Sequence, residues 1–95
     1  MARRLEWSAR ARQDVAAIEA YYALVASPRV AGLARDAIVA AALKIWALPA
    51  DFRSGKPGTR EYVMRPFPYT VIYRANADLV RIVRVMHQSR RYFNG

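Results

Sequence analysis

Hydrophobic and polar residues alternate at the start of the chain, then recur at helical spacing, and each change of spacing predicts a change of element. Residues 4–7 alternate polar and apolar, which predicts a short strand with Leu5 and Trp7 on its inner side. Ser8 is a good helix N-cap and introduces a helix over about residues 9–26. Its predicted buried stripe holds Val15, Ile18, Tyr22 and Val25, with Asp14 and Glu19 on the wetter side.

A second helix is predicted from Ser27, because a capping residue followed by proline is a helix start signal. Pro49 ends it. Since the connection is short, the two helices are expected to run antiparallel as a hairpin. The predicted buried stripe of the second helix consists of Val30, Leu33, Ala37, Ile38, Ala41, Ile45 and Leu48. The alanines allow close approach to a neighbouring element.

Residues 50–59 are rich in Gly, Pro and Ser, which predicts an irregular surface loop carrying Arg53 and Lys56. After it the period becomes two, which predicts strands over about residues 60–65, 69–75 and 78–87. Asn76-Ala77 suggests a two-residue hairpin with Ala75 opposite Asp78. That register puts on one face Tyr69, Val71, Tyr73, Val80, Ile82, Arg84 and Met86, whereas a one-residue bulge would exchange part of this set.

The elements together predict an α+β fold, in which an N-terminal strand and an antiparallel helical hairpin pack on a C-terminal three-stranded antiparallel meander. We expect one domain over residues 1–95, because the chain has 95 residues, 55% of them hydrophobic, enough for a single core. No cysteine, signal peptide or apolar run of about 18 residues occurs, which favours a cytoplasmic protein.

Charge narrows the class of partner. The chain has 16 basic and 7 acidic side chains and a formal net charge of +9. Such a field attracts phosphate backbones, anionic lipid or an acidic protein. The sequence contains no carboxylate pair, metal-ligand cluster, phosphate-binding glycine loop or nucleophile motif, so we expect no cofactor and no metal.

Arginines recur along the predicted strands, at Arg60, Arg65, Arg74, Arg81 and Arg84, and suggest a binding surface. Arg84 falls on the predicted covered face, where a buried guanidinium must be paired, and Glu61 is the preferred partner with Asp14 as the alternative. His87, the only histidine, is either a general base or a hydrogen-bonded structural residue. Arg90 and Arg91 beside Tyr92 and Phe93 form either a stacking surface for a target or a last contact with the domain.

The order of these pieces resembles the RelE/ParE superfamily of bacterial toxins. The resemblance covers nearly the whole chain and rests on segments 58–61 (Gly-Thr-Arg-Glu), 68–74 (Pro-Tyr-Thr-Val-Ile-Tyr-Arg) and 82–87 (Ile-Val-Arg-Val-Met-His), with Arg90 close behind. It implies the toxic half of a two-gene toxin-antitoxin module of the plasmid-stabilisation type. It also implies a ParD-like antitoxin as partner, which the net charge predicts to be acidic and amphipathic.

The superfamily divides by target. RelE-like members are similar in cutting messenger RNA in the ribosome without a metal, which in this chain would involve Arg65, Arg81, His87 and Arg90. A key arginine of those nucleases usually follows the first aromatic residue of the strand at 69–73, and this chain has Thr70 there. Threonine cannot neutralise a charged phosphorane.

The substitution favours ParE-like members, which poison DNA gyrase by binding it. Under this interpretation no residue is favoured as catalytic, and Arg90, Arg91 and Tyr92 are the predicted target-binding residues. A ribosome-dependent endoribonuclease and a basic nucleic-acid-binding module remain the alternatives.

Overall fold

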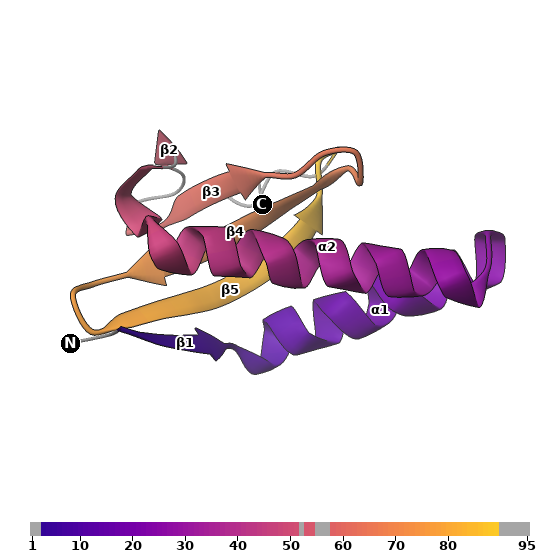
Figure 1. The fold of residues 1–95 in the computed structure, drawn as a ribbon, viewed down its shortest axis with the longest axis horizontal. Coiled ribbons are helices and arrows are strands. Elements are labelled where there is room, and N and C mark those ends of the chain that lie inside the picture. The colour runs from indigo at the N-terminus through magenta and orange to yellow at the C-terminus, as the bar shows by residue number, and fades with distance from the viewer. Residues whose placement is uncertain (1–2, 52, 55–57, 90–95) are drawn as a thin grey trace.

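The computed structural model describes residues 3–51, 53–54 and 58–89, which form a sheet with a helical hairpin on one face (Figure 1). In chain order the elements are β1 (Arg4–Trp7), α1 (Ala9–Val25), α2 (Pro28–Ala47), a 3-10 turn η1 (Pro49–Asp51), β2 (Arg53–Ser54), β3 (Arg60–Val63), β4 (Tyr69–Ala75) and β5 (Leu79–His87). This order confirms the predicted α+β class, with its N-terminal strand, helical hairpin and C-terminal meander.

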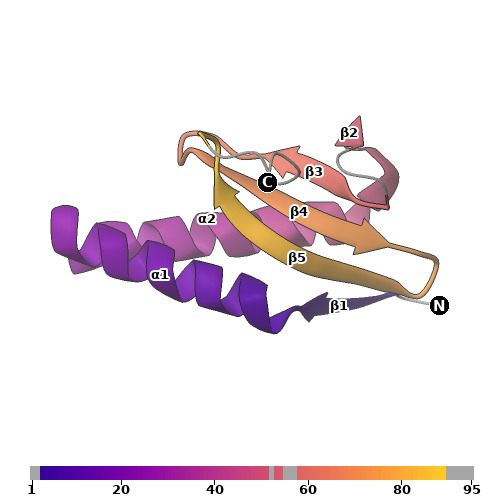
Figure 2. The same cartoon turned by 180° about the vertical axis from the view of Figure 1, so that it is seen from behind.

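The sheet is wider than the predicted meander. Its strand order is β1-β5-β4-β3-β2, with β1 parallel to β5 and the other neighbours antiparallel. The N-terminal strand therefore lies beside the last strand, and two residues of the predicted loop pair with β3 as β2. Figure 2, seen from behind, shows β5 and β4 in front of α2.

Both helices begin where the sequence predicts. Ser8 Oγ accepts a hydrogen bond from the Ala11 N–H at 2.9 Å, and Ser27 Oγ accepts one from the Val30 N–H at 3.1 Å. Each serine thus satisfies one of the N–H groups that the first helical turn leaves unpaired. Neither helix of the described chain is long and apolar enough to cross a membrane.

The core lies between the hairpin and the sheet, and its fully buried side chains include Ile38, Ile45, Val71, Tyr73, Val80 and Ile82. Three predicted core positions are wrong, since Val25, Leu33 and Leu48 are 57%, 46% and 59% exposed. Val25 ends α1 at the hairpin tip, which projects past the sheet (Figure 1). Leu33 lies five residues before Ile38 and hence about 140° away around the helix. Leu48 follows the last residue of α2.

The predicted hairpin register is also wrong, because the two-residue turn is Ala77-Asp78 rather than Asn76-Ala77. Ala75 pairs with Val80 rather than Asp78, and the turn is closed by a 2.9 Å bond from the Asn76 N–H to the Leu79 carbonyl. The Asn76 side-chain oxygen accepts the Asp78 N–H at 2.8 Å, and this hydrogen bond stabilises a turn that lacks the usual glycine.

A bulge then shifts the register between β4 and β5. Tyr73 pairs with Ile82 whereas Ile72 pairs with Arg84, so Val83 is the extra residue. Past the bulge, each side chain changes face relative to the prediction. Val85, which is 3% exposed, packs into the core where Arg84 was expected, and Met86 likewise leaves the predicted covered face.

Candidate functional site

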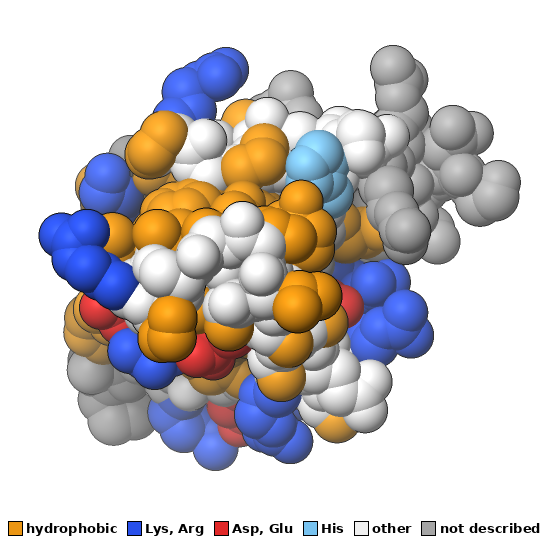
Figure 3. Space-filling model, turned by 90° about the vertical axis from the view of Figure 1, so that its right-hand side faces the viewer, with side chains coloured by type: hydrophobic (Ala, Val, Ile, Leu, Met, Phe, Trp, Pro, Cys, Tyr) orange, Lys and Arg blue, Asp and Glu red, His pale blue; other side chains and the backbone are white. Residues whose placement is uncertain are grey.

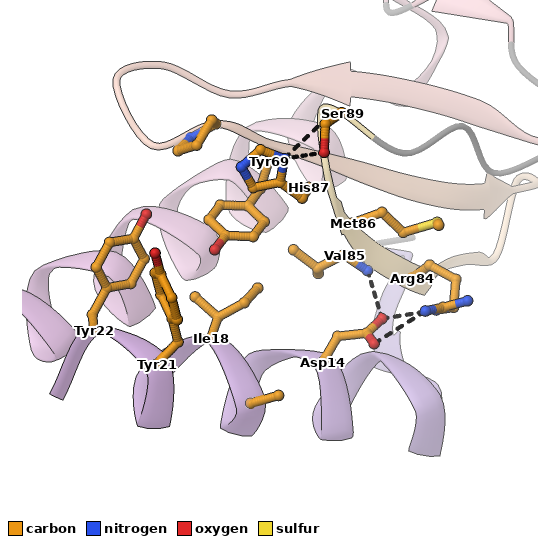
Figure 4. A pocket seen from close by; sticks show the side chains of 12 residues that line it. Asp14, Ile18, Tyr21, Tyr22, Tyr69, Arg84, Val85, Met86, His87 and Ser89 are labelled. Atoms are coloured by element: carbon orange, nitrogen blue, oxygen red, sulfur yellow. Dashed lines mark hydrogen bonds and ion pairs between the residues drawn. The ribbon is translucent and has the colours of Figure 1, made fainter. Parts of the chain in front are cut away.

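A pocket of about 560 Å³ lies where α1 diverges from the sheet, beside the end of β5 (Figure 4). One wall comes from α1 and the other from the start of β4 and the end of β5. The lining side chains that matter here are Asp14, Ile18, Tyr21, Tyr22, Tyr69, Arg84, Val85, Met86, His87 and Ser89. Figure 3 looks at this end of the molecule and shows hydrophobic side chains gathered beside the histidine, with basic side chains around them.

Aromatic rings form the inner part of the pocket. Tyr22 meets Phe67 edge to face, with ring centroids 5.4 Å apart, and meets Tyr69 in the same way at 6.4 Å. Tyr69 in turn meets His87 at 5.4 Å with the rings nearly perpendicular. Such pairs add to the stability gained from burying the rings, so the pocket wall is held in one arrangement.

The surroundings of the pocket act on the Tyr69 phenol. Burial, followed by a hydrogen bond with Tyr22 and the proximity of Tyr22 and Tyr21, raises the pKa of Tyr69 to about 12. Desolvation disfavours the charged phenolate, which is why the shift is upward. The Tyr69 phenol therefore stays protonated and takes part in binding as a neutral hydrogen-bonding group.

His87 is exposed and is held by the residues that follow it. The Ser89 backbone N–H donates to His87 Nδ1 at 3.0 Å, and the Ser89 hydroxyl lies 2.8 Å from the same nitrogen. A nitrogen that accepts an N–H bond carries the lone pair, so in the neutral imidazole the proton is on Nε2. The lone pair that a general base needs is thus already engaged by Ser89.

Asp14 anchors the other side of the pocket. Its carboxylate accepts bonds from Arg84 Nε at 2.8 Å and from the Val85 N–H at 2.9 Å, and Arg10 lies 3.8 Å away. The Asp14 side chain is only 12% exposed, so its predicted place on the wetter side of the helix is wrong. Ala11 and Ile18, three residues before and four after it, are both buried, so Asp14 lies on the buried side of the helix.

The structure pairs Arg84 with the alternative partner, Asp14. Glu61 and Arg84 both lie opposite Ile72, on the two sides of β4, and Glu61 is 9% exposed. The direct pair between Glu61 and Arg84 stays a prediction.

The residues of the nuclease hypothesis are spread over the fold. Arg81 lies six residues before His87 on β5, about 20 Å along the strand, and contacts Glu6 at 3.4 Å. Arg65 is exposed in the connection between β3 and β4, at the same end of the sheet as His87. Thr70 pairs with Met86 and is half-buried. Arg90 lies outside the described residues, as do Arg91 and Tyr92.

Sequence reasoning missed the pocket because its walls come from distant segments. Tyr21, Tyr22 and Ser89 belong to no motif, Tyr69 was identified only as part of a strand, and the fold brings the four together. In the part of the chain that the structure describes, no cluster of three or more acidic or histidine side chains is placed to hold a metal ion.

Comparison with solved structures shows which class of protein has this fold. The toxin-antitoxin system described as the chromosomal ParDE system of P. aeruginosa matches with a TM-score of 0.82 and 22% identity, over 90% of this chain and 96% of that chain. The DinJ-YafQ toxin-antitoxin complex of E. coli matches with a TM-score of 0.58 and 18% identity, over 100% of both chains. YafQ of E. coli strain BL21(DE3) matches with a TM-score of 0.54 and 20% identity, over 92% of this chain and 94% of that one.

These likenesses show that the chain shares its fold with the solved ParDE and YafQ structures. The family described as the ParE toxin of the type II toxin-antitoxin system, parDE, matches residues 5–92. The chain therefore belongs to the ParE toxin family, and it is a toxin of the type II toxin-antitoxin class. Among curated proteins, no sequence matches it.

Proposed function

We propose that this toxin acts by binding DNA gyrase, and that an acidic, ParD-like antitoxin neutralises it in the cytoplasm. Membership of the ParE family supports this choice within the superfamily, because the resemblance to ParE toxins implies gyrase poisoning. The antitoxin part is supported by the net charge of +9. It is also supported by the exposed apolar residues of the hairpin, such as Leu24 at 85% and Leu43 at 52%.

The observation that carries the proposal is the separation of Arg81 from His87 along β5. Cleavage of RNA by its own 2′-hydroxyl needs a base and a cation within reach of the same phosphate. A separation of about 20 Å along the strand puts Arg81 and His87 out of reach of one phosphate. Arg65, in the exposed connection between β3 and β4, is then the described cation of the nuclease hypothesis at the His87 end of the sheet. Thr70 supplies no charge, and the Nδ1 lone pair of His87 accepts the Ser89 N–H.

A toxin that inhibits by binding needs surface side chains that contact the target and needs no catalytic group. We propose Arg90, Arg91 and Tyr92 as target contacts, because they follow the last strand in a basic segment with an aromatic side chain. These three residues lie outside the described part of the chain, so the proposal rests on their sequence alone.

The test combines a purified assay with a cellular one. The purified toxin is added to gyrase and supercoiled plasmid, and we expect accumulation of cleaved DNA held in gyrase complexes. In parallel, messenger RNA from induced cells is mapped by primer extension. Codon-positioned cuts in that RNA, together with unaffected gyrase, would refute the gyrase proposal and establish the ribosome-dependent nuclease instead.

A further inference from the structure

The outer edge of β5 is covered by three different kinds of group in succession. β1 pairs with it as far as Ile82, whose carbonyl accepts the Ser8 N–H at 2.9 Å. The Ser8 hydroxyl then donates to the Val83 carbonyl at 2.8 Å. After the bulge, Asp14 accepts the Val85 N–H at 2.9 Å. Side chains at the start of α1 thus take over from the strand.

Beyond the Val85 N–H, no described residue covers the edge in this way. The Tyr69 carbonyl accepts the Met64 N–H at 2.9 Å, so the backbone polar groups of Tyr69 point toward β3. Tyr69 and His87 are therefore a non-hydrogen-bonded pair of the β4–β5 ladder. The Gln88 N–H bonds to the Pro68 carbonyl at 2.8 Å, toward β4. By alternation, the Val85 carbonyl and the His87 N–H and carbonyl point outward. Among the described residues they have no partner.

These backbone groups border the pocket, and the pocket is large enough for more than one side chain. At about 560 Å³ it is within the range of typical ligand sites. Its helix wall presents Ile18 and Tyr21, with Tyr21 54% exposed. A chain that hydrogen-bonded to the Val85–His87 edge would therefore place alternate side chains against an apolar wall.

Charge selects the occupant further. Among the lining residues that the structure describes, Asp14 is the only carboxylate, and it contacts both Arg84 and Arg10. Arg10 is 63% exposed on its side chain and available to an incoming group. An acidic side chain on the incoming segment meets a net positive rim, whereas a basic one is repelled.

From this juxtaposition we infer that the free edge of β5 at Val85–His87 receives an extended, acidic segment of the antitoxin, which adds a strand to the sheet in the space between β5 and α1. The inference rests on the proposed antitoxin partnership and specifies its mode. The main-chain bonds hold the segment, the pocket takes an apolar side chain, and Arg10 pairs with an acidic one.

Amide hydrogen exchange on the intact toxin, measured by NMR with and without a co-expressed ParD-like antitoxin, tests the inference. The His87 amide is expected to exchange at least about 10-fold more slowly in the complex, since it gains a hydrogen bond. The amides of Val85 and Gln88 are internal controls, because both are already bonded in the free toxin.

A pair of variants isolates the main-chain bond. His87→Ala removes the side chain and keeps the N–H, whereas His87→Pro removes both, and proline is tolerated where an edge N–H faces outward. We expect the antitoxin to bind His87→Pro about 3- to 10-fold more weakly than His87→Ala, the value of one hydrogen bond.

The possible contrary results are distinct. If the complex forms but the His87 amide exchanges as in the free toxin, strand addition is refuted while the antitoxin partnership stands. If the His87 amide of the toxin alone slows with rising concentration, a second copy of this chain occupies the edge, and the inference is also refuted. If no complex forms, the proposed antitoxin partnership and the strand addition are both refuted.

Discussion

Asp14 on α1 and Arg84 on β5, 70 positions apart, form a two-point ion pair, with Nε to Oδ2 at 2.8 Å and the second guanidinium nitrogen to Oδ1 at 3.3 Å. The same carboxylate accepts the Val85 N–H just after the bulge. One side chain thus fixes the distance between the helical hairpin and the sheet and also caps a strand edge. Bidentate pairs of this type are among the more specific polar contacts.

Replacing Asp14 by Ala is expected to lower the free energy of unfolding by about 2 to 4 kcal/mol, because removal of one partner from a buried pair costs about 3 to 5 and this pair is partly buried. The Val85 N–H also loses its acceptor. Glu19→Ala is the control, since its 3.4 Å contact with Arg35 is at the surface and is worth at most about 1 kcal/mol. Urea unfolding of both variants makes the comparison. Equal midpoints would show that the Asp14 pair contributes nothing.

The strand assignment predicts which positions tolerate charge. Val71 and Ile82 are both 0% exposed, so Val71→Asp or Ile82→Asp is expected to unfold the domain, since an unpaired buried carboxylate costs several kcal/mol against a total of about 5 to 15. Ala77→Asp, in the exposed turn between β4 and β5, is expected to fold normally. Circular dichroism distinguishes the outcomes, and native spectra for the two strand variants would contradict the core described here.

Local signals in the sequence predicted most of the fold. The caps at Ser8 and Ser27 are short-range features, and the helix starts were predicted correctly from them. The period-two pattern placed β4 over its observed bounds, because side chains alternate within a strand whatever its neighbour does. Leucine at position 33 was misplaced because hydrophobicity alone does not say which side of an alanine-rich helix is covered.

Features that depend on pairing between distant segments were beyond the sequence. The bulge at Val83 is a property of two strands together, and it exchanges Arg84 for Val85 in the core. Asp14 was misplaced for the related reason that its acceptor role exists only once the β5 edge lies beside α1. The pocket likewise needs α1, β4 and β5 in their final positions. Its histidine was identified as a candidate because it is the only one in the sequence and ends the segment 82–87.

Ser8 caps α1 and also binds a strand carbonyl, and comparison with Ser27, an ordinary cap, measures the second contact. The Ser8 hydroxyl oxygen accepts the Ala11 N–H and its O–H donates to the Val83 carbonyl, whereas the Ser27 hydroxyl oxygen accepts the Val30 N–H as a cap. Ser27→Ala is expected to cost about 1 kcal/mol, and Ser8→Ala about 2, because it also leaves a strand carbonyl unpaired. Thermal or urea unfolding measures the difference. If the two variants are equally stable, the bond to Val83 has no net value.

The raised pKa of Tyr69 predicts how stability depends on pH in alkaline solution. The unfolded chain releases this phenol proton near 10.0, whereas the folded protein retains it until about 12. Between these values the folded state binds more protons, so the free energy of unfolding falls as pH rises through this window. Tyr69→Phe is expected to show a shallower fall over the same window. Ionisation of Tyr69 near pH 10, followed by phenolate absorbance, would contradict the assignment.

The last prediction separates target binding from catalysis in cells. His87→Ala is expected to leave toxicity nearly unchanged, because a binding toxin needs no imidazole base. Arg90→Ala with Arg91→Ala is expected to weaken toxicity without unfolding, if these cations contact the target. The charge-matched control is Arg29→Ala with Arg74→Ala, which removes two exposed arginines elsewhere on the surface.

Growth arrest after induction is scored together with the amount of folded protein in each strain. Full toxicity of the Arg90/Arg91 variant would exclude this segment as the target contact. Loss of toxicity in His87→Ala, with RNA cuts present only in the unsubstituted toxin, would return the imidazole to a catalytic role.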